Sequence, residues 1–442
     1  MILKHKHIVF IKLLALCQLA AAGFAGQAMA QNLTSSPYSR FGIGDLLNRS
    51  TGRGQAMGGL SCGLPSSKNL NLLNPSSLAG LDTMSFILEL GGYDKVTDLR
   101  TTDLHRTMNN VGVSYLAMAF PVTKWWKAAV GVLPFSNVAY NISMTEKNAL
   151  MGDVVSRFKG SGGTSQFVIS QSVTPIKFRY NKKIDPVTLS LGLNFSYLFG
   201  PISHTRSLEI PADSLYFSTH SQRTAILGDI DFSYGTQLHV PLPGNFFLTA
   251  GGIYRHSTDI RTESRYLVTS TGSGFTDTLL YEEDPHNSVV LPQGWGAGFT
   301  FGKSNQFIAG FEYRSQDWSK ATFLGQPDSM ARSRDFIGGV EFIPNIYSLT
   351  SYLQKVRYRA GFRYSETYLQ LNGYQLNEFG ITFGAGFPIQ DRIRRGTQSS
   401  LNVILELGKR GTVKNDLIRE MYGTLTLQLT LHDRWFEKRY YD

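Results

Sequence analysis

The chain has 442 residues, of which 42% are hydrophobic and 17% charged, and its formal net charge is +10. Beyond residue 30, no apolar run reaches the ~18 residues that a membrane-spanning helix needs, which excludes a helical membrane protein. Cys17 and Cys62 are the two cysteines, so the chain after residue 30 forms no internal disulfide. The basic residues are dispersed, which argues against a nucleic-acid-binding protein.

Residues 1–30 have the features of a secretory signal peptide. Three lysines stand among the first twelve residues, and the apolar stretch Ile8 to Ala25 overlaps the last of them. Ala28-Met29-Ala30 fits the small-x-small cleavage pattern, so we predict that the mature chain begins at Gln31. Export also removes the protein from cytoplasmic nucleic acid, and we expect no nucleic-acid partner.

Residues 31–83 differ in composition from the rest of the chain. They are rich in glycine, serine, asparagine and proline, and they show no sustained alternation of apolar and polar residues. Pro75 is suited to begin a short helix. Such a segment would be disordered alone, so we predict a hatch, or plug, held inside a barrel.

Residues 84–442 alternate between apolar and polar side chains in most segments. In the last of these, leucines alternate with threonines and one glutamine from Thr424 to Leu431. Neighbouring side chains of a strand face opposite ways, so one wall is apolar and the other polar. We predict an all-β fold, a transmembrane antiparallel barrel of about fourteen strands in the Gram-negative outer membrane. The predicted strands are 84–95, 110–121, 127–143, 165–180, 187–210, 225–240, 245–260, 291–302, 306–318, 334–342, 355–368, 376–389, 400–408 and 421–432.

The stretch 261–290 is long and polar, and we predict an extracellular loop there. Tryptophans near the predicted strand ends suit the aromatic girdles that lie at membrane interfaces. These are Trp125, Trp126, Trp318 and Trp435.

Arg357, Arg359 and Arg363 share one face of a predicted strand. An arginine facing hydrocarbon costs ~2–4 kcal/mol near the bilayer midplane, so these side chains must face the lumen. One interpretation is a docking site for an anionic headgroup or carboxylate. The favoured interpretation is pairing with the plug or with luminal acids, namely Asp229, Asp231, Glu312 and Glu341.

Gly294, Gly296 and Gly298 form a second feature of the predicted inner wall, opposite aromatic residues that face outward. Glycine there lets plug backbone approach closely, which is the favoured interpretation. Alternatively these glycines permit a strand kink that opens a lateral gate to the membrane.

Catalytic chemistry is not expected. His239, Asp229 and Asp231 share the predicted luminal face, but no nucleophile signature and no metal-binding spacing accompanies them. We therefore predict no catalytic residue, no metal and no cofactor, and we interpret these side chains as part of a polar lumen.

The predicted plug also carries a recognisable order of motifs. It contains Ser36-Pro37-Tyr38-Ser39-Arg40-Phe41-Gly42, then Ala56-Met57-Gly58-Gly59, then Asn74-Pro75-Ser76-Ser77. This order resembles the FadL-like outer-membrane proteins, especially those of Bacteroidetes. The Asn-Pro-Ser-Ser stretch is similar to the Asn-Pro-Ala motif of that family's hatch.

The resemblance implies a fourteen-stranded barrel with an N-terminal hatch. Many relatives pass fatty acids or other hydrophobic molecules, and we expect passive passage of such a fatty-acid-like ligand across the outer membrane. The expected gate is the hatch, with Gly58, Gly59, Asn74, Pro75 and Ser76 at its joints. The alternative is a non-transporting subunit of an outer-membrane complex, either barrel-assembly machinery or type IX secretion. The expected partners are membrane lipid, a hydrophobic ligand and other outer-membrane proteins.

Overall fold

The computed structural model describes residues 36–47, 50–149, 151–180, 184–211, 216–272, 274–324, 326–327, 330–389 and 398–434. They all belong to one compact unit, Ser35–Asp442. The predicted signal peptide and Trp435 lie outside the described residues. In these described ranges, no helix is long and apolar enough to cross a bilayer.

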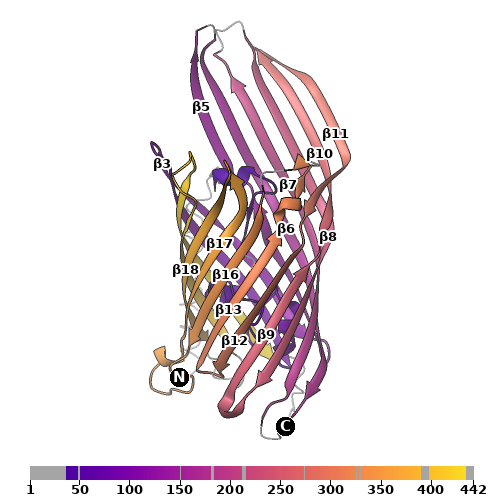
Figure 1. Cartoon of the computed structure of the whole chain (residues 1–442), viewed down its shortest axis with the longest axis vertical. Coiled ribbons are helices and arrows are strands. Elements are labelled where there is room, and N and C mark those ends of the chain that lie inside the picture. The colour runs from indigo at the N-terminus through magenta and orange to yellow at the C-terminus, as the bar shows by residue number, and fades with distance from the viewer. Residues whose placement is uncertain are drawn as a thin grey trace, which may run out of the picture. The chain divides into compact units, whose positions relative to one another are not determined.

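Fourteen antiparallel strands form a closed barrel, which confirms the predicted fold class (Figure 1). The ring closes where β20 pairs with β2, so the barrel wall has no free edge. In ring order the strands are β2 (Ser85–Arg100), β3 (His105–Pro121), β4 (Trp126–Asn137), β6 (Gly152–Phe178), β7 (Val187–Glu209), β8 (Ser218–Pro241), β9 (Phe246–Arg255), β12 (Gly294–Lys303), β13 (Phe307–Asp317), β16 (Arg332–Phe342), β17 (Arg357–Leu371), β18 (Tyr374–Ile389), β19 (Ser399–Arg410) and β20 (Arg419–Arg434).

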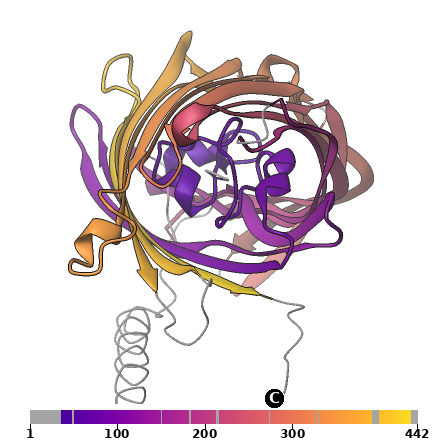
Figure 2. The same ribbon diagram turned by 90° about the horizontal axis from the view of Figure 1, so that it is seen from below.

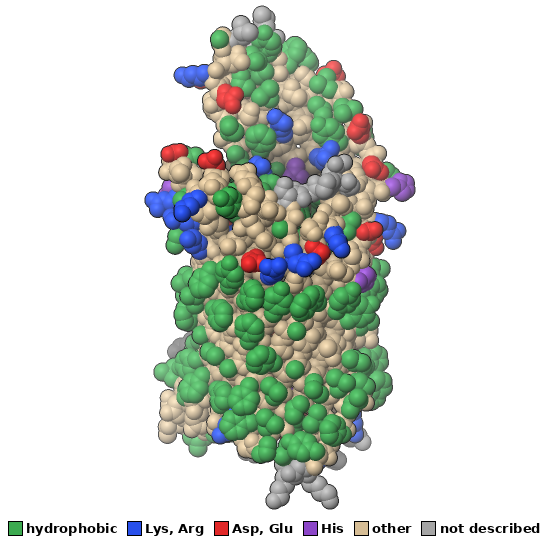
Figure 3. All heavy atoms as spheres, viewed as in Figure 1, with side chains coloured by type: hydrophobic (Ala, Val, Ile, Leu, Met, Phe, Trp, Pro, Cys, Tyr) green, Lys and Arg blue, Asp and Glu red, His purple; other side chains and the backbone are tan. Residues whose placement is uncertain are grey.

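The alternation of the sequence separates the two walls of the barrel. On β20, Leu425 and Leu427 are exposed on the outside, whereas Thr426 and Gln428 are buried inside. Figure 3 shows the result, a continuous apolar belt with charged side chains gathered above it. An apolar belt without charges is what bilayer hydrocarbon requires. The protein is an integral outer-membrane barrel.

Six strands continue beyond the belt on one side and form a sheet that we call the crest (Figure 1). It consists of β5 (Tyr140–Asn148), the upper parts of β6, β7 and β8, and the hairpin of β10 (Thr258–Gly272) and β11 (Phe275–Leu291). The prediction of a polar loop at 261–290 is therefore wrong, because these residues form two strands. Its polarity reflects a sheet wetted on both faces, and its β-branched and aromatic residues favour strands.

The opposite end of the barrel carries turns, several of them short. β12 and β13 are joined by three residues, and β8 and β9 by a link that contains η3 (Pro243–Asn245). Outer-membrane barrels place short turns in the periplasm and long extensions outside. The crest therefore marks the extracellular end. Further short elements are η4 (Trp318–Lys320), β14 (Thr322–Phe323), β15 (Gln326–Pro327) and η5 (Leu353–Lys355).

Residues 36–47 and 50–82 lie inside the ring of strands, as the view along the barrel shows (Figure 2). We call them the luminal segment. It contains η1 (Pro37–Arg40), β1 (Asp45–Leu46), α2 (Gly52–Gln55) and η2 (Pro75–Gly80), the last beginning at the proline expected to start a helix. Most of its apolar side chains are buried.

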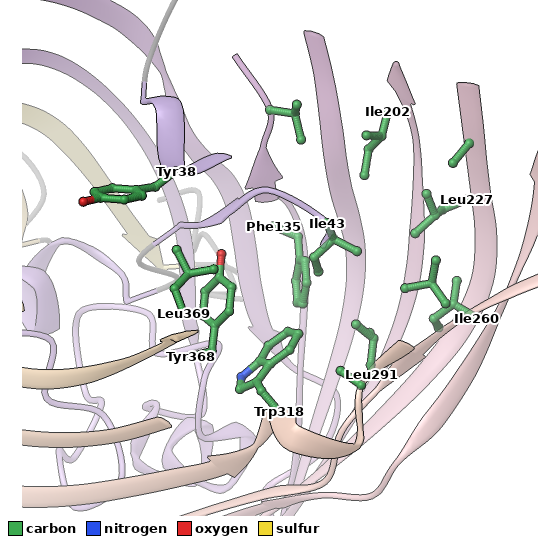
Figure 4. Close-up of a cluster of buried hydrophobic side chains, with 14 of the residues drawn as sticks. Tyr38, Ile43, Phe135, Ile202, Leu227, Ile260, Leu291, Trp318, Tyr368 and Leu369 are labelled. Carbon is green, nitrogen blue, oxygen red and sulfur yellow. The ribbon is translucent and has the colours of Figure 1, made fainter. Parts of the chain in front are cut away.

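A hydrophobic cluster lies at the extracellular mouth, and we call it the mouth core (Figure 4). Tyr38 and Ile43 of the luminal segment pack there with Phe135 of the wall and Ile202 at the base of the crest. Trp318 is 2% exposed within this core. Its assignment to an interfacial girdle was wrong, because its strand end turns inward over the lumen. Trp125, in contrast, is 59% exposed.

Candidate functional site

The luminal segment contacts the inner wall at close range because the wall offers glycines. A Cβ on Gly251 of β9 would lie 1.9 Å from the carbonyl oxygen of Cys62, and one on Gly361 of β17 would lie 2.2 Å from the nitrogen of Gly58. No side chain fits at either position. The inner wall is thus shaped to the backbone of the segment.

The first charged anchor joins α2 of the segment to two strands. Arg53 donates hydrogen bonds of 3.1 and 2.8 Å to the carboxylate of Glu341 on β16. Arg359 on β17 donates a 2.7 Å bond to the same carboxylate and another of 2.7 Å to Asn402. All three charged side chains are at most 11% exposed. One glutamate therefore binds two buried arginines, one from the luminal segment and one from the barrel wall.

Glu312 on β13 forms the second anchor. Its carboxylate accepts hydrogen bonds of 2.7 Å from the backbone N–H groups of both Ser61 and Cys62. Arg314 pairs with Glu312 and donates to the carbonyl of Gly59 in the segment. Cys62 is fully buried here.

The third anchor lies near the mouth. Asp45 of the luminal segment accepts hydrogen bonds of 3.0 and 3.1 Å from Arg410 on β19. Arg410 also pairs with Glu420 on β20, and Ser36 donates to that carboxylate. The three anchors thus fix the segment from the mouth down to its middle.

The five predicted joint residues are all in the luminal segment. Gly58 and Gly59 adopt left-handed φ angles of 76° and 107°, and Gly58 donates a 2.9 Å hydrogen bond to Thr382. Asn74 caps η2, because its side-chain oxygen accepts hydrogen bonds from the backbone nitrogen (3.2 Å) and the hydroxyl (2.6 Å) of Ser76. Pro75, like the other four, is buried. Their role as joints of a gate stays a prediction.

The arginine ladder and the two predicted aspartates do not meet. Arg363 pairs with Glu378 and Glu406 at 2.9 and 2.8 Å, and Arg357 donates a 3.3 Å hydrogen bond to Gln398. Asp231 pairs instead with Arg255, and Asp229 with Arg261. Of the acids proposed as partners for the ladder, Glu341 alone contacts it among the described residues.

The glycines of β12 face the lumen, opposite the exposed Trp295 and Phe299. A Cβ on Gly296 would meet the sulfur of Cys62 at 3.3 Å, and one on Gly298 would meet Glu312 at 3.0 Å. Gly294 begins the strand, and β12 keeps a continuous register with both neighbours. The geometry therefore shows that these glycines allow neighbouring groups to pack closely against β12. Their part in a lateral gate stays a prediction.

Two cavities lie beside the luminal segment. The upper one, of about 280 Å³, lies beneath the mouth core and is lined by Leu133, Phe135 and Trp318 together with charged residues of the anchors. The lower one, of about 570 Å³, lies at the periplasmic turns. In the described part of the chain, no group of His, Cys, Asp or Glu is placed to hold a metal ion.

The sequence model of the BamG family matches residues 10–442. The chain belongs to the BamG family. No curated protein matches the sequence.

This BamG family member has the fold of FadL-like barrels. A FadL homologue of Pseudomonas aeruginosa superposes with a TM-score of 0.57 at 10% identity, covering 90% of this chain and 100% of that one. The toluene transporter TodX of P. putida gives 0.54 at 14% identity, covering 89% and 100%. The monoaromatic hydrocarbon channel CymD gives 0.54 at 12% identity, covering 88% and 99%. These likenesses establish the fold.

Several residues that fix the segment in this BamG family member were missed from sequence. They include Arg53, Asp45, Arg314 and Arg410. A charged residue in the inward phase of an alternating strand marks the lumen, and Arg410 and Arg314 carry that signal. Nothing in the sequence marks Arg53 or Asp45, because their partners lie 288 and 365 residues away.

Proposed function

We propose that this protein is a non-transporting, FadL-like subunit of an outer-membrane protein complex, namely the barrel-assembly machinery. The observation that carries the proposal is the fixed luminal segment, bound to β13, β16, β17, β19 and β20 by buried ion pairs and hydrogen bonds. A barrel whose lumen is filled in this way serves better as a structural body than as a channel.

The anchors make displacement of the segment costly. Removing one partner of a buried ion pair costs about 3–5 kcal/mol, because the other charge stays buried without compensation. Opening the lumen would separate Arg53 from Glu341, Ser61 from Glu312 and Asp45 from Arg410 together. The sequence encodes no energy source for such a step. Thermal opening is therefore too rare to support passive passage through the centre.

The outer surface offers an exposed area to which partner proteins could bind. The crest projects beyond the membrane, and its β11 carries a long exposed stretch from Phe275 to His286. Membership of the BamG family supports the barrel-assembly alternative stated from the sequence. In this proposal residues 1–30 are the export signal, 31–83 the hatch and 84–442 the barrel, of the Bacteroidetes type.

Passage of a hydrophobic small molecule is the second candidate, and the upper cavity favours it. Leu46, Leu133, Phe135 and Trp318 give this cavity apolar walls beneath the mouth core. Two of the compared structures, CymD and TodX, are a monoaromatic hydrocarbon channel and a toluene transporter. In this candidate Gly58, Gly59 and Asn74-Pro75-Ser76 would be joints of the gate, and Gly294, Gly296 and Gly298 would bend β12.

Purification of the tagged chromosomal protein from native outer membranes in mild detergent separates the two candidates. We expect a fixed stoichiometry of other outer-membrane proteins, identified and counted by mass spectrometry. Depletion of the protein should then lower the amounts of other barrels in the membrane. A barrel that elutes alone with bound fatty acid or another apolar compound would contradict the proposal and support passage. A tagged, unrelated outer-membrane barrel from the same cells is the control.

A further inference from the structure

The lower cavity differs from the rest of the lumen in the balance of its charges. Five cationic and two carboxylate side chains line it, a net charge of +3. The cations are Arg53, Lys68, Lys124, Lys177 and Arg357, and the carboxylates are Asp185 and Glu341. Elsewhere in the described lumen, arginines are matched by nearby carboxylates.

The single buried carboxylate of this cavity is already engaged. Glu341 holds Arg53 and Arg359, so it cannot neutralise a further cation. Among the described residues, no carboxylate lies within 4.0 Å of the charged groups of Lys68 or Arg357. Both side chains are partly withdrawn from solvent and lie in each other's field. Burial and the neighbouring Arg357 and Arg53 lower the pKa of Lys68 to about 8, and the carboxylate of Asp82 only partly opposes this shift.

Unpaired cations in a half-buried cavity are costly, and an anionic ligand would offset that cost. The position of the cavity limits where such an anionic ligand can come from. The cavity is lined by the luminal segment, by the inner faces of strands and by the periplasmic turns, so the wall of the barrel separates it from the bilayer. A lipid within the leaflet would have to leave the membrane to enter it, whereas a periplasmic chain approaches from the end at which the lining turns lie.

The remaining lining suits a peptide. Ser66, Asn69, Ser190 and Gln237 offer hydroxyl and amide groups to backbone, and Trp125, Pro186, Phe247 and Ile343 offer apolar contacts. A volume of about 570 Å³ falls within the ~300–1,000 Å³ range of ligand pockets. Arginine and lysine at its floor would bind carboxylates of the entering chain.

We propose that this cavity is a docking site for an acidic, extended segment of a periplasmic partner protein, held through Lys68 and Arg357. The inference rests on the proposed function, because it names the kind of partner that a complex subunit would receive on its periplasmic side.

The test uses the purified full-length barrel in zwitterionic detergent and a fluorescein-labelled ten-residue peptide of alternating glutamate and serine. Fluorescence anisotropy should show saturable binding, and the same peptide with glutamine in place of glutamate should not bind. The double variant Lys68→Gln/Arg357→Gln should weaken binding at least tenfold, whereas Arg357→Lys should keep most of it. The matched control, Arg106→Gln/Lys147→Gln, removes the same charges from exposed positions at the extracellular end and should bind normally.

Titration sharpens the test. Because the pKa of Lys68 is about 8, its ammonium group is mostly charged at pH 7 and mostly neutral at pH 9. Peptide affinity should therefore fall across this interval, and Lys68→Gln should remove that part of the pH dependence. Heat-modifiable migration in gels checks that each variant is folded.

Three results would overturn the inference. One is the absence of peptide binding, and another is equal binding by the cavity variant and its control. The third is binding of inorganic phosphate or phosphatidylglycerol, lost in the cavity variant, without binding of the peptide, which would assign the site to a phosphate group. Co-purification of wild-type protein with partners is measured separately, so the proposed function can survive the loss of this inference. If both hold, Lys68→Gln/Arg357→Gln should lose a periplasmic partner that Arg106→Gln/Lys147→Gln retains.

Discussion

Ion pairs of the same chemistry occur in the lumen and in the crest, but water reaches them differently. Arg359 and Glu341 have side-chain exposures of 0% and 5%, whereas Arg157 and Glu209 in the crest have 45% and 48%. Water and salt screen the crest pair, and two long side chains lose entropy in holding it. The luminal pairs are shielded and shared among several strands. The lumen is therefore the stabilised part of this molecule, and the crest is a solvated extension of it.

The substitution expected to have the largest effect on the contrast between lumen and crest is Glu341→Ala. It leaves Arg53 and Arg359 buried without a carboxylate, and we expect a loss of about 3–5 kcal/mol of stability. The temperature of heat-modifiable gel migration should fall. Cys62, the one cysteine after residue 30 and fully buried, should become reactive towards maleimide as the segment loosens. Glu209→Ala in the crest is the control, and equal effects of the two variants would contradict the comparison.

A second, smaller effect is expected from adjacent glycines of β9. Gly251→Ala places a methyl group 1.9 Å from the carbonyl oxygen of Cys62, while Gly252→Ala meets nothing closer than 3.5 Å. Overpacking of this kind costs about 1–3 kcal/mol. Maleimide labelling of Cys62 should rise in the first variant and stay unchanged in the second. Unchanged labelling in both would mean that the segment tolerates displacement, which favours passage through the lumen.

Shortening the crest should leave the lumen intact. Replacing residues 264–284 with an Asn-Gly turn removes the outer parts of β10 and β11, which pair with each other and with β8. We expect normal heat-modifiable migration and unreactive Cys62, together with the loss of any partner that binds outside the membrane. A destabilised barrel would show that the crest supports the lumen after all.

The smallest effect should come from Arg157→Ala in the crest. An exposed ion pair of this kind contributes about 0–1 kcal/mol. The unfolding midpoint in urea should therefore change little, and added salt should reduce the difference further. A clear loss of stability would place this pair among the structural contacts and would weaken the contrast with the lumen.

Alternation alone was enough to predict the barrel and its fourteen membrane strands. In each strand, such as β20, apolar side chains mark the face toward lipid and polar side chains mark the face toward the lumen. The same rule failed for 261–290, where both faces of the sheet are wet and no apolar wall exists. It also placed Arg357, Arg359 and Arg363 inside without naming their partners. Glu378 lies on the neighbouring strand β18 and Glu406 on β19, and their distances from Arg363 depend on the register between these strands, which alternation does not give.

The seam of the barrel has a consequence for how the protein is made. β2 and β20 pair along sixteen residues, so the last segment of the chain completes a ring around the segment that precedes the first strand. Once this seam has formed, the luminal segment can enter the ring only through one of its two ends, past the crest or past the periplasmic turns. Contact with the sheet before β2 and β20 meet requires no such threading. We therefore expect the N-terminal residues to settle against the growing sheet before its two edge strands pair, so that the chain encloses its own beginning as it finishes folding.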